Sequence, residues 1–316
     1  MKKYLITGVG GFVGRYFWEY LLEHEQDFCV LGLDMLPEAP WEHPAFQYRQ
    51  LNMLDAEAMC RVVETFQPDY IAHLASISSV GQSWKAPAVC FTNNTSVFLN
   101  LAEAVRAHCP EARVLSIGSS EEYGNYPPES MPLREDYELK PCNPYAVARV
   151  AQEMLSKLYA DNYGLRIMMT RSFNHIGPHQ RDCFVIPSFV KQLMEIKKNG
   201  GKGTMRVGNL DIVRDFLDVR DAVDAYWQIL TKGNAGEIYN VCTGSGIKIK
   251  NIIMHIAKYL DVDPVIEVDN SLIRPTDNSV IIGDNSKITK YFNWKPRISL
   301  QESINDIIIN STTKES

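Results

Sequence analysis

Hydrophobic and polar positions alternate in blocks along the first half of the chain. The apolar runs with the length of buried strands are residues 4–7, 29–33, 70–75 and 114–117. The helical patterns between or before them are residues 14–23, 56–66 and 97–108. Strands that alternate with helices in this way form parallel sheets, because each connection has to cross the sheet. The pattern therefore predicts an α/β fold with a doubly wound parallel sheet.

The second half of the chain continues this pattern and then loses it. Residues 145–163 predict one long helix, and residues 166–170 predict the strand that follows it. From Phe173 onward, glycine-rich turns interrupt the alternation, and residues 238–241 form one more strand pattern. We expect residues 1–172 to form a dinucleotide-binding domain, with a returning strand near 238–242. Residues 173–316 would mainly form a smaller, discontinuous C-terminal domain that binds substrate.

Composition narrows the class of protein. The 316 residues are 45% hydrophobic and 22% charged, with a net charge of −6, as in ordinary globular enzymes. An acidic balance disfavours nucleic-acid partners, and no apolar run reaches the roughly 18 residues of a membrane span. The seven cysteines are scattered and lack a C-x-x-C pair, which indicates reduced thiols and a cytoplasmic location.

A glycine-rich turn follows the first predicted strand. Gly8, Gly11 and Gly14 are spaced three apart and open the first predicted helix. Glycine permits a tight turn and lets backbone N–H groups approach a pyrophosphate at the positive end of the helix. The alternative is a glycine-rich turn without a ligand. The strand–turn–helix context favours a Rossmann-type dinucleotide site.

Asp34 ends the second predicted strand, about twenty residues after the turn. A carboxylate there accepts hydrogen bonds from ribose hydroxyls and repels a 2′-phosphate, and no arginine follows directly. The prediction is NAD rather than NADP, and the alternative is a solvated aspartate at a strand end. The expected cofactor-binding residues are Gly8, Gly11, Phe12, Val13, Asp34, Met35, Asn52, Met53, Leu74, Ala75, Ser76, Asn94, Tyr145 and Arg149.

A candidate catalytic group follows the predicted strand 114–117. Tyr145 has a cation, Arg149, one helical turn later, and Ser119 lies just after the strand. A tyrosine can pass a proton to or from a carbinol oxygen when a neighbouring cation stabilises its ionised form. Ser119 could hydrogen-bond the same oxygen. A tyrosine with a cation four residues later is common, so the interpretation depends on the dinucleotide site before it.

The whole chain resembles an extended short-chain dehydrogenase/reductase of the nucleotide-sugar epimerase/dehydratase group. More narrowly, it is similar to the branch that contains GDP-mannose 4,6-dehydratases and GDP-4-keto-6-deoxy-mannose reductases. The strings that carry the narrower resemblance are Ser119–Gly124 (SSEEYG), Arg171–Pro178 (RSFNHIGP), Val207–Asn209 with Arg214–Phe216, Arg274–Asp277 (RPTD) and Trp294–Pro296 (WKP).

The resemblance implies roles for individual residues. Ser119, Tyr145 and Arg149 would form the catalytic triad, and Glu121 stands where dehydratases carry a general acid/base. The residues expected at the nucleotide diphosphate are Asn174, Lys191, Arg214 and Arg274, with Asp277 near the base or ribose. For each basic residue the alternative is a solvated surface charge. The resemblance implies two departures from the family: Arg149 replaces a lysine, and Asp34 contrasts with the arginine that NADP-dependent relatives usually carry near this point.

These features predict an NAD(H)-dependent oxidoreductase acting at C4 of a GDP-linked hexose, most specifically a GDP-4-keto-6-deoxy-hexose reductase. One alternative is a GDP-hexose 4,6-dehydratase that uses Glu121. Another, prompted by Arg149, is a catalytically silent module that binds NAD or a nucleotide sugar.

Two further expectations concern metals and assembly. Gly177-Pro178 separates His175 from His179 and breaks helical spacing, so no metal site is expected. The resemblance implies a homodimer or homotetramer, paired through helix 97–105 and the outer face of the Tyr145 helix. Core packing explains the same apolar residues equally well.

Overall fold

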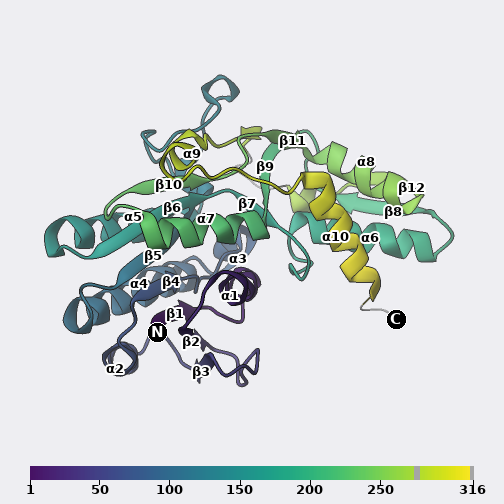
Figure 1. Cartoon of the computed structure of the whole chain (residues 1–316). Helices are drawn as coiled ribbons and strands as arrows, with labels where there is room; N and C mark the ends of the chain where they lie inside the picture. Colours follow the sequence, from purple (N-terminus) through teal and green to yellow (C-terminus); the bar gives the residue numbers. More distant parts are fainter. Residues whose placement is uncertain (274–277, 314–316) are drawn as a thin grey trace.

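One seven-stranded parallel sheet organises the protein. Figure 1 labels its strands from β10 at one edge to β3 at the other. The structure is a computed structural model that describes residues 1–273 and 278–313. The strands, in spatial order, are β10 (Ile238–Val241), β6 (Arg166–Ser172), β5 (Arg113–Ser119), β4 (Tyr70–His73), β1 (Lys2–Thr7), β2 (Phe28–Asp34) and β3 (Phe46–Gln50). This order, with β1 central and the chain winding outward in both directions, confirms the predicted doubly wound sheet.

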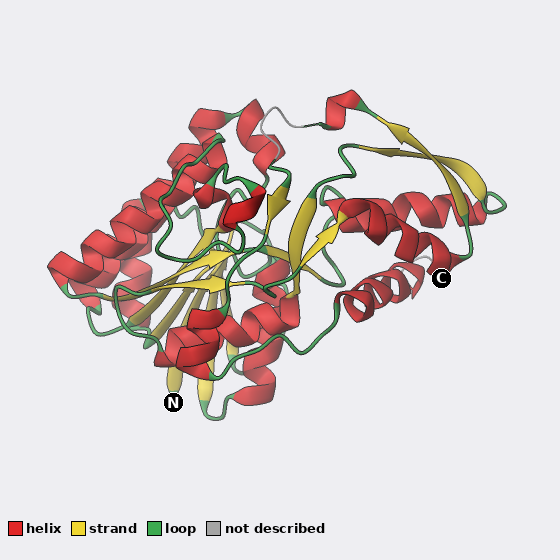
Figure 2. Ribbon diagram, turned by 90° about the horizontal axis from the view of Figure 1, so that it is seen from above, coloured by secondary structure: helices red, strands yellow, loops and turns green. Residues whose placement is uncertain are grey.

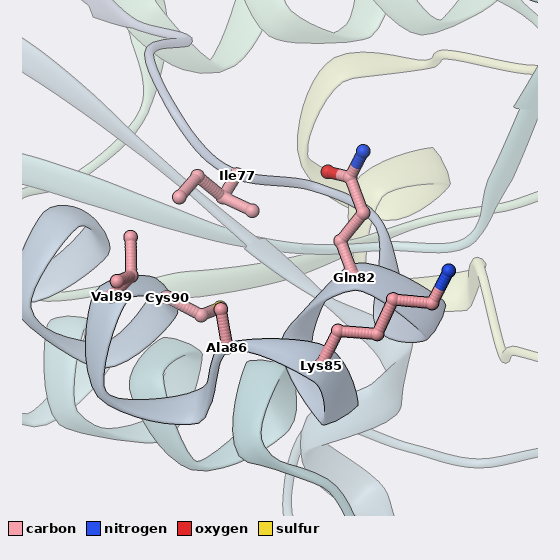
Figure 3. A pocket seen from close by; sticks show the side chains of 6 residues that line it. All are labelled: Ile77, Gln82, Lys85, Ala86, Val89 and Cys90. Carbon is pink, nitrogen blue, oxygen red and sulfur yellow. The ribbon is translucent and has the colours of Figure 1, made fainter.

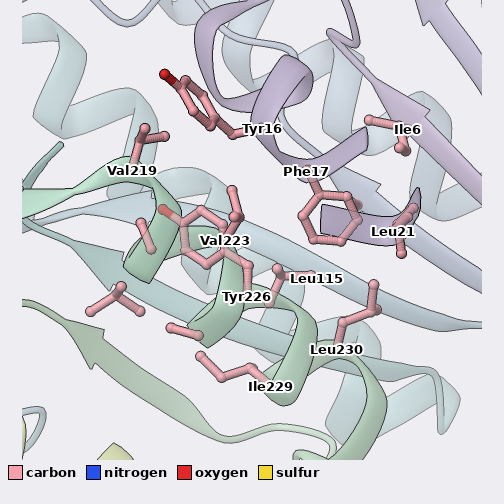
Figure 4. Packing of buried hydrophobic residues seen from close by; sticks show 14 of the residues in the cluster. Ile6, Tyr16, Phe17, Leu21, Leu115, Val219, Val223, Tyr226, Ile229 and Leu230 are labelled. Atoms are coloured by element: carbon pink, nitrogen blue, oxygen red, sulfur yellow. The ribbon is translucent and has the colours of Figure 1, made fainter. Parts of the chain in front are cut away.

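Helices cover both faces of this sheet, which is why its strands are apolar on both sides. One face carries α1 (Phe12–His24) and α7 (Val219–Lys232), whose side chains pack with those of the strands in Figure 4. The other face carries α2 (Ala56–Phe66), α4 (Pro87–His108) and α5 (Pro144–Tyr163). The short helix α3 (Val80–Lys85) precedes α4.

The helix α5 has strong local signals at both ends. Its N-cap residue Asn143 accepts a hydrogen bond from the backbone N–H of Ala146, and Pro144 occupies the first turn. Gly164 ends the helix in the left-handed conformation, at φ 71°. These signals fix where the helix begins, and hence the position of Tyr145 in its first turn.

The strand β10 lies at the edge of the large sheet, beside β6. It pairs in parallel with β6 from Ile238 opposite Met169 to Val241 opposite Ser172. The chain reaches this edge only after passing through residues 173–237, so the large sheet is discontinuous in sequence. The helix α7 enters through this same later stretch and covers β4 and β5.

The remaining elements form a smaller group that lies beside the large sheet and carries the C-terminus (Figures 1 and 2). Its strands are β7 (Asn174–Ile176), β8 (Lys202–Val207), β9 (Val213–Asp218), β11 (Gly246–Lys248), β12 (Asp263–Val268) and β13 (Val280–Ile281). Its helices are α6 (Val185–Lys198), α8 (Ile249–Leu260) and α10 (Leu300–Thr313), with α9 (Ser286–Phe292) near β10. This group has its own buried core. The division at residue 172 into two functional domains stays a prediction.

Several boundaries differ from the expected ones by one or two residues, and the start of α4 differs most. The helix α4 begins at Pro87 rather than Val97, because a proline at its start and polar side chains along its first turns hide the apolar period. The strand β4 ends at His73, since the Ala75 backbone N–H donates to the Thr7 side chain instead of to a backbone carbonyl of a neighbouring strand. Within the described residues, no helix has the length and apolar character to span a membrane.

Candidate active site

The glycine turn joins β1 to α1 and has the geometry of a dinucleotide cradle. Gly8 has φ 70°, and a Cβ atom there would lie 2.8 Å from the Ala75 backbone. A Cβ at Gly14 would lie 2.3 Å from Val9 O, so α1 can approach the turn only with glycine at this position. The turn therefore brings the predicted residues Leu74 and Ala75 next to the start of α1.

The first turn of α1 is open to an anionic ligand. Its N-cap is Gly11, which has no side chain to accept hydrogen bonds from the helix N–H groups. Phe12 and Val13 are the first two residues of this helix. Tyr16 Oη donates to Pro178 O at 3.0 Å, so the loop after β7 lies against the same helix. Uncapped N–H groups at a positive helix end suit a pyrophosphate.

His73 supplies a further observation that fits a bound dinucleotide. Its Nδ1 lies 2.9 Å from Thr7 Oγ1, whereas its Nε2 has no hydrogen-bond partner within the described residues. Burial and the charge of Arg149 lower the pKa of His73 to about 3, so the ring is neutral. The cradle and this orphaned nitrogen both fit a nicotinamide dinucleotide.

Asp34 stands at the end of β2, facing the glycine turn. Its carboxylate accepts hydrogen bonds from the backbone N–H groups of Gly10 at 2.9 Å and Met35 at 2.7 Å. Beyond β3, Asn52 Oδ1 accepts from the backbone of Leu54, and Met53 is buried. Their assignment to the adenosine stays a prediction.

Tyr145 and Arg149 face each other on one side of α5. Arg149 Nε lies 3.2 Å from Tyr145 Oη, and the guanidinium carbon is 5.2 Å from the ring centroid. Both residues are buried, with exposed fractions of 7% for Tyr145 and 5% for Arg149. The spacing in the sequence therefore corresponds to a direct contact, which places a cation at the tyrosine hydroxyl.

Uncharged acceptors hold the rest of the Arg149 guanidinium. Nη1 donates to Ile117 O at 3.0 Å and to Gln152 Oε1 at 2.6 Å. Nη2 donates to Ser76 Oγ. The guanidinium thus links the loop after β4, the end of β5 and α5, so Ser76 and Arg149 of the predicted cofactor set are in contact.

Ser119 ends β5 and caps the short 3₁₀ helix η1 (Ser120–Tyr123). Its Oγ accepts a hydrogen bond from the Glu121 backbone N–H at 3.2 Å. Glu121 Oε2 in turn accepts from Asn143 Nδ2 at 2.8 Å, and Asn143 is the N-cap of α5. Glu121 therefore connects the Ser119 turn to the helix that carries Tyr145.

A buried ionic cluster lies beneath this turn. Arg171 pairs with Glu153 through two hydrogen bonds of 2.8 Å and lies 4.7 Å over the ring of Tyr123. Glu122 Oε1 accepts from the Ser119 backbone N–H at 2.5 Å. Burial, followed by the charge of Glu153, raises the pKa of Glu122 well above its usual range. Burial therefore favours the neutral form of Glu122, and its carboxyl group supports the Ser119 backbone.

Asn94 is fully buried on α4 and holds the loop after β4. Its Oδ1 accepts from the backbone N–H of Ile77 at 2.8 Å, and its Nδ2 donates to Ile77 O at 3.1 Å. Both ends of the amide are engaged with the loop that contains Ser76. The predicted contact of Asn94 with the cofactor stays a prediction, and in this structure the side chain orders the loop.

The residues expected at the nucleotide diphosphate come together only in part. Asn174 on β7 donates to Asp215 O of β9 at 3.0 Å, and Asp215 directly follows Arg214 in that strand. Arg214 Nη1 donates to Asn278 O at 2.7 Å. Lys191 lies exposed on α6, with its Nζ 2.6 Å from Asp182 Oδ2. Arg274 and Asp277 lie outside the described residues. All five assignments stay predictions.

A small cavity of about 240 Å³ opens between α3 and the start of α4. Its lining residues, drawn in Figure 3, are Ile77, Gln82, Lys85, Ala86, Val89 and Cys90. Ile77 and Cys90 also belong to the apolar cluster that contains Tyr145. The apolar wall behind the tyrosine is therefore continuous with this cavity.

Three residues in and around the site escaped the sequence analysis: Glu122, Asn143 and Gln152. A motif signalled the first two, since Asn143 precedes a proline at a helix start and Glu122 completes a capping box with Ser119. Gln152 is seven residues after Tyr145, on the same helix face, where a buried polar residue is unusual.

His175 lies on β7, and its Nε2 shares a hydrogen bond of 2.6 Å with Tyr226 Oη. This hydrogen bond explains the burial of the ring without a metal.

Known proteins are similar to this chain over nearly its whole length. The family model for "GDP-mannose 4,6 dehydratase" matches residues 5–307. A GDP-6-deoxy-D-mannose reductase of Pseudomonas aeruginosa is 31% identical over 97% of this chain and 96% of its own length. A GDP-mannose 4,6-dehydratase of Yersinia enterocolitica is 26% identical over 98% of this chain and 93% of its own. The structure of RMD from Pseudomonas aeruginosa complexed with NADPH superimposes with a TM-score of 0.86 at 30% identity, covering 99% of this chain and 100% of that one.

Proposed function

This chain belongs to the GDP-mannose 4,6 dehydratase family, and we propose that it is a GDP-4-keto-6-deoxy-hexose reductase. The observation that carries the choice of reaction is the 31% identity to a GDP-6-deoxy-D-mannose reductase over nearly the full length of both chains. The buried Tyr145–Arg149 pair supplies a proton donor, and Glu121 connects the Ser119 turn to the start of the same helix.

Tyr145, Ser119 and Arg149 have separate roles at the C4 oxygen of the sugar. When bound, the nicotinamide cofactor supplies the hydride that reduces the C4 carbon. Tyr145 donates its hydroxyl proton to the C4 oxygen, so the ketone becomes an alcohol, and Ser119 orients that oxygen by a hydrogen bond. Arg149 holds the nicotinamide ribose and stabilises the tyrosinate that the proton transfer leaves behind. The loop of Leu74, Ala75 and Ser76 lines the same place.

Product analysis tests the proposal directly. Purified protein is incubated with a GDP-4-keto-6-deoxy-hexose and NADH, and the product is identified by mass spectrometry. We expect NADH oxidation that depends on the keto sugar and yields a GDP-6-deoxy-hexose. NADH that binds without any turnover would contradict the proposal and favour the silent-module alternative.

Glu121 supports one alternative reaction, a GDP-hexose 4,6-dehydratase. Its carboxylate lies within the Ser119 turn, where it could exchange protons with the C5 and C6 positions of a sugar. Incubation with GDP-mannose separates the two reactions. A dehydratase would release water and give a 4-keto-6-deoxy product without net cofactor consumption, whereas a reductase would leave GDP-mannose unchanged.

We propose NAD(H) as the cofactor rather than NADP(H). The Asp34 carboxylate stands at the glycine turn, and none of residues 35–42 is basic, so a 2′-phosphate would meet negative charge without a counterion. The RMD structure from Pseudomonas aeruginosa contains NADPH, so the cofactor proposed for this chain differs from the one bound in that structure. We expect kcat/KM for NADH to exceed that for NADPH, and Asp34→Ala to reduce the difference.

We propose that a GDP-sugar binds between the two groups of elements. Asn174 on β7 is opposite Phe216 of β9, two residues after Arg214, and Arg214 is the planar cation best suited to the diphosphate. Arg214→Met should raise the KM for the GDP-sugar with little effect on NADH binding. Lys191 is a weaker candidate because Asp182 engages its ammonium group.

We also propose a homodimer that pairs through α4 and α5. Val97, Leu101 and Val105 are buried in the core of the chain, but the outer surface still carries apolar side chains. The exposed ones are Val89, Phe91 and Leu99 on α4 and Val147, Met154 and Leu158 on α5. Light scattering should give twice the monomer mass, and Met154→Glu should shift the measured mass toward that of the monomer.

We propose a cytoplasmic location, with which the free cysteines agree.

A further inference from the structure

Gln152 is a buried amide whose orientation its neighbours dictate. It lies on α5 facing β5, and its side chain is 1% exposed. Its Nε2 donates to Ser116 Oγ at 2.9 Å and to Ile117 O at 3.2 Å. The amide oxygen therefore has to point the other way, toward Arg149, and it accepts from Nη1 at 2.6 Å.

This acceptor matches an arginine and not a lysine. The guanidinium presents several N–H groups in a fixed fork, so Nη1 can reach Gln152 while Nε remains at Tyr145 Oη. A lysine carries all three of its donors on one nitrogen, so it has no second nitrogen to place at Gln152 Oε1 while the first stays at Tyr145 Oη. With lysine at this position, Gln152 Oε1 would be a buried acceptor without its charged donor, which is unfavourable.

Helical spacing places the three residues in one row. Arg149 is four residues after Tyr145, and Gln152 is three residues after Arg149, so all three face the same way on α5. Ile117 O accepts from both Arg149 and Gln152, which ties the row to β5. The guanidinium is thus fixed on the side away from the tyrosine.

We propose that Gln152 is a positioning residue that fixes the Arg149 guanidinium with its Nε toward Tyr145, so that this site is built for arginine. The side chain of Gln152 contacts Arg149, Ser116 and Ile117, so its proposed action is through Arg149. The inference rests on the proposed function for the role of Arg149 at the cofactor ribose. It also explains how the chain accommodates arginine at a position where the family resemblance leads us to expect lysine.

A double-mutant cycle on the full chain tests the proposal, with NADH affinity measured by fluorescence titration. Gln152→Met keeps the length of the side chain and removes both polar groups. We expect it to weaken NADH binding about tenfold, because the charged hydrogen bond that orients Arg149 is lost. Once Arg149→Lys is present, adding Gln152→Met should cost less than about twofold, because the acceptor no longer has a partner to lose.

Two variants separate positioning from simple structural support. Gln152→Glu keeps an acceptor oxygen facing Arg149, so it should restore NADH affinity to within about threefold of the original chain. Ser156→Ala is the matched control, since Ser156 is fully buried on the same helix face and donates to Ser116, but not to Arg149. It should lower thermal stability and leave NADH affinity unchanged. Gln152→Glu also keeps the test usable if Gln152→Met does not fold.

The outcomes distinguish this inference from the proposed function. Equal losses from Gln152→Met with and without Arg149→Lys would overturn the positioning role, as would a Gln152→Glu variant no better than Gln152→Met. NADH binding that shows the expected coupling, without turnover of a 4-keto sugar, would overturn only the proposed reaction. A chain that binds no NADH would overturn both.

Discussion

Two buried arginines on neighbouring elements are held in opposite ways. Arg171, on β6, is 3% exposed and forms a two-bond ion pair with Glu153. Arg149, on α5, is 5% exposed, and all four of its acceptors are uncharged. The positive charge of Arg171 is neutralised inside the fold, whereas that of Arg149 remains available to a ligand or a tyrosinate.

The difference separates a structural cation from a functional one. A buried charge without a counterion is costly, and proteins keep one where it serves binding or catalysis. A buried pair is sensitive in another way, because removing one partner leaves the other charge uncompensated. The two arginines should therefore respond to the same substitution in different measurements.

The largest expected effect on stability comes from Arg171→Met. The substitution leaves the Glu153 carboxylate buried next to Glu122, so we expect the free energy of unfolding to fall by about 3–5 kcal/mol. Urea denaturation followed by circular dichroism measures this. The joint variant Arg171→Met with Glu153→Met should recover at least half of the loss, and a joint variant as unstable as the single one would contradict the account.

The same substitution at Arg149 should act on catalysis instead. Arg149→Met should lower kcat by about 10²–10⁴-fold, the usual range for losing support of a proton donor. Its free energy of unfolding should change by no more than about 1 kcal/mol, because relief from burying an unpaired charge offsets the lost hydrogen bonds. A stability loss as large as that of Arg171→Met would remove the distinction between the two arginines.

Replacing Arg171 by lysine tests the same comparison of the two arginines with a smaller expected loss of stability. Arg171→Lys keeps the charge but can make only one of the two hydrogen bonds to Glu153, so we expect a loss of about 1–2 kcal/mol. Thermal and urea unfolding measure it, with the exposed pair Arg61–Glu57 as a control. Arg61→Lys should change stability by less than about 0.5 kcal/mol.

The smallest expected effect is a pH dependence that Glu122 contributes. Burial and the Glu153 charge raise the pKa of Glu122 in the folded state. Its contribution is therefore fully present below the unfolded-state pKa and is lost as the pH rises through the folded-state value. Glu122→Gln, which keeps a neutral side chain, should gain stability relative to the original chain as the pH rises. A difference that does not vary with pH between acid and neutral solution would refute this.

Local signals in the sequence identified the residues that act within one turn or one helix. The spacing of Gly8, Gly11 and Gly14 predicts the cradle, and the spacing of Tyr145 and Arg149 predicts a contact that the structure contains. The strand pattern at 238–241 corresponds to β10 without any shift. In each case the period of a helix or strand fixes the geometry, so a single chain is enough.

Pairings between distant segments could not be predicted in this way. Arg171 and Glu153 are eighteen residues apart, and only the packing of β6 against α5 brings them together. The acceptor role of Gln152 depends on which side of α5 faces Ser116 of β5. Lys191 carries the right charge for a diphosphate, but Asp182 is close enough to engage it. Charge and residue type alone do not distinguish these outcomes.

The late return of β10 to the large sheet has a consequence for synthesis on the ribosome. While the chain grows, β6 is complete by residue 172, but its outer edge stays unpaired until residues 238–241 have emerged. The apolar face of the sheet that α7 covers is also uncovered until residue 232. A nascent chain of the first 172 residues therefore presents an open strand edge and a bare apolar face, the features that chaperones bind. We expect a fragment that ends there to aggregate when it is expressed alone.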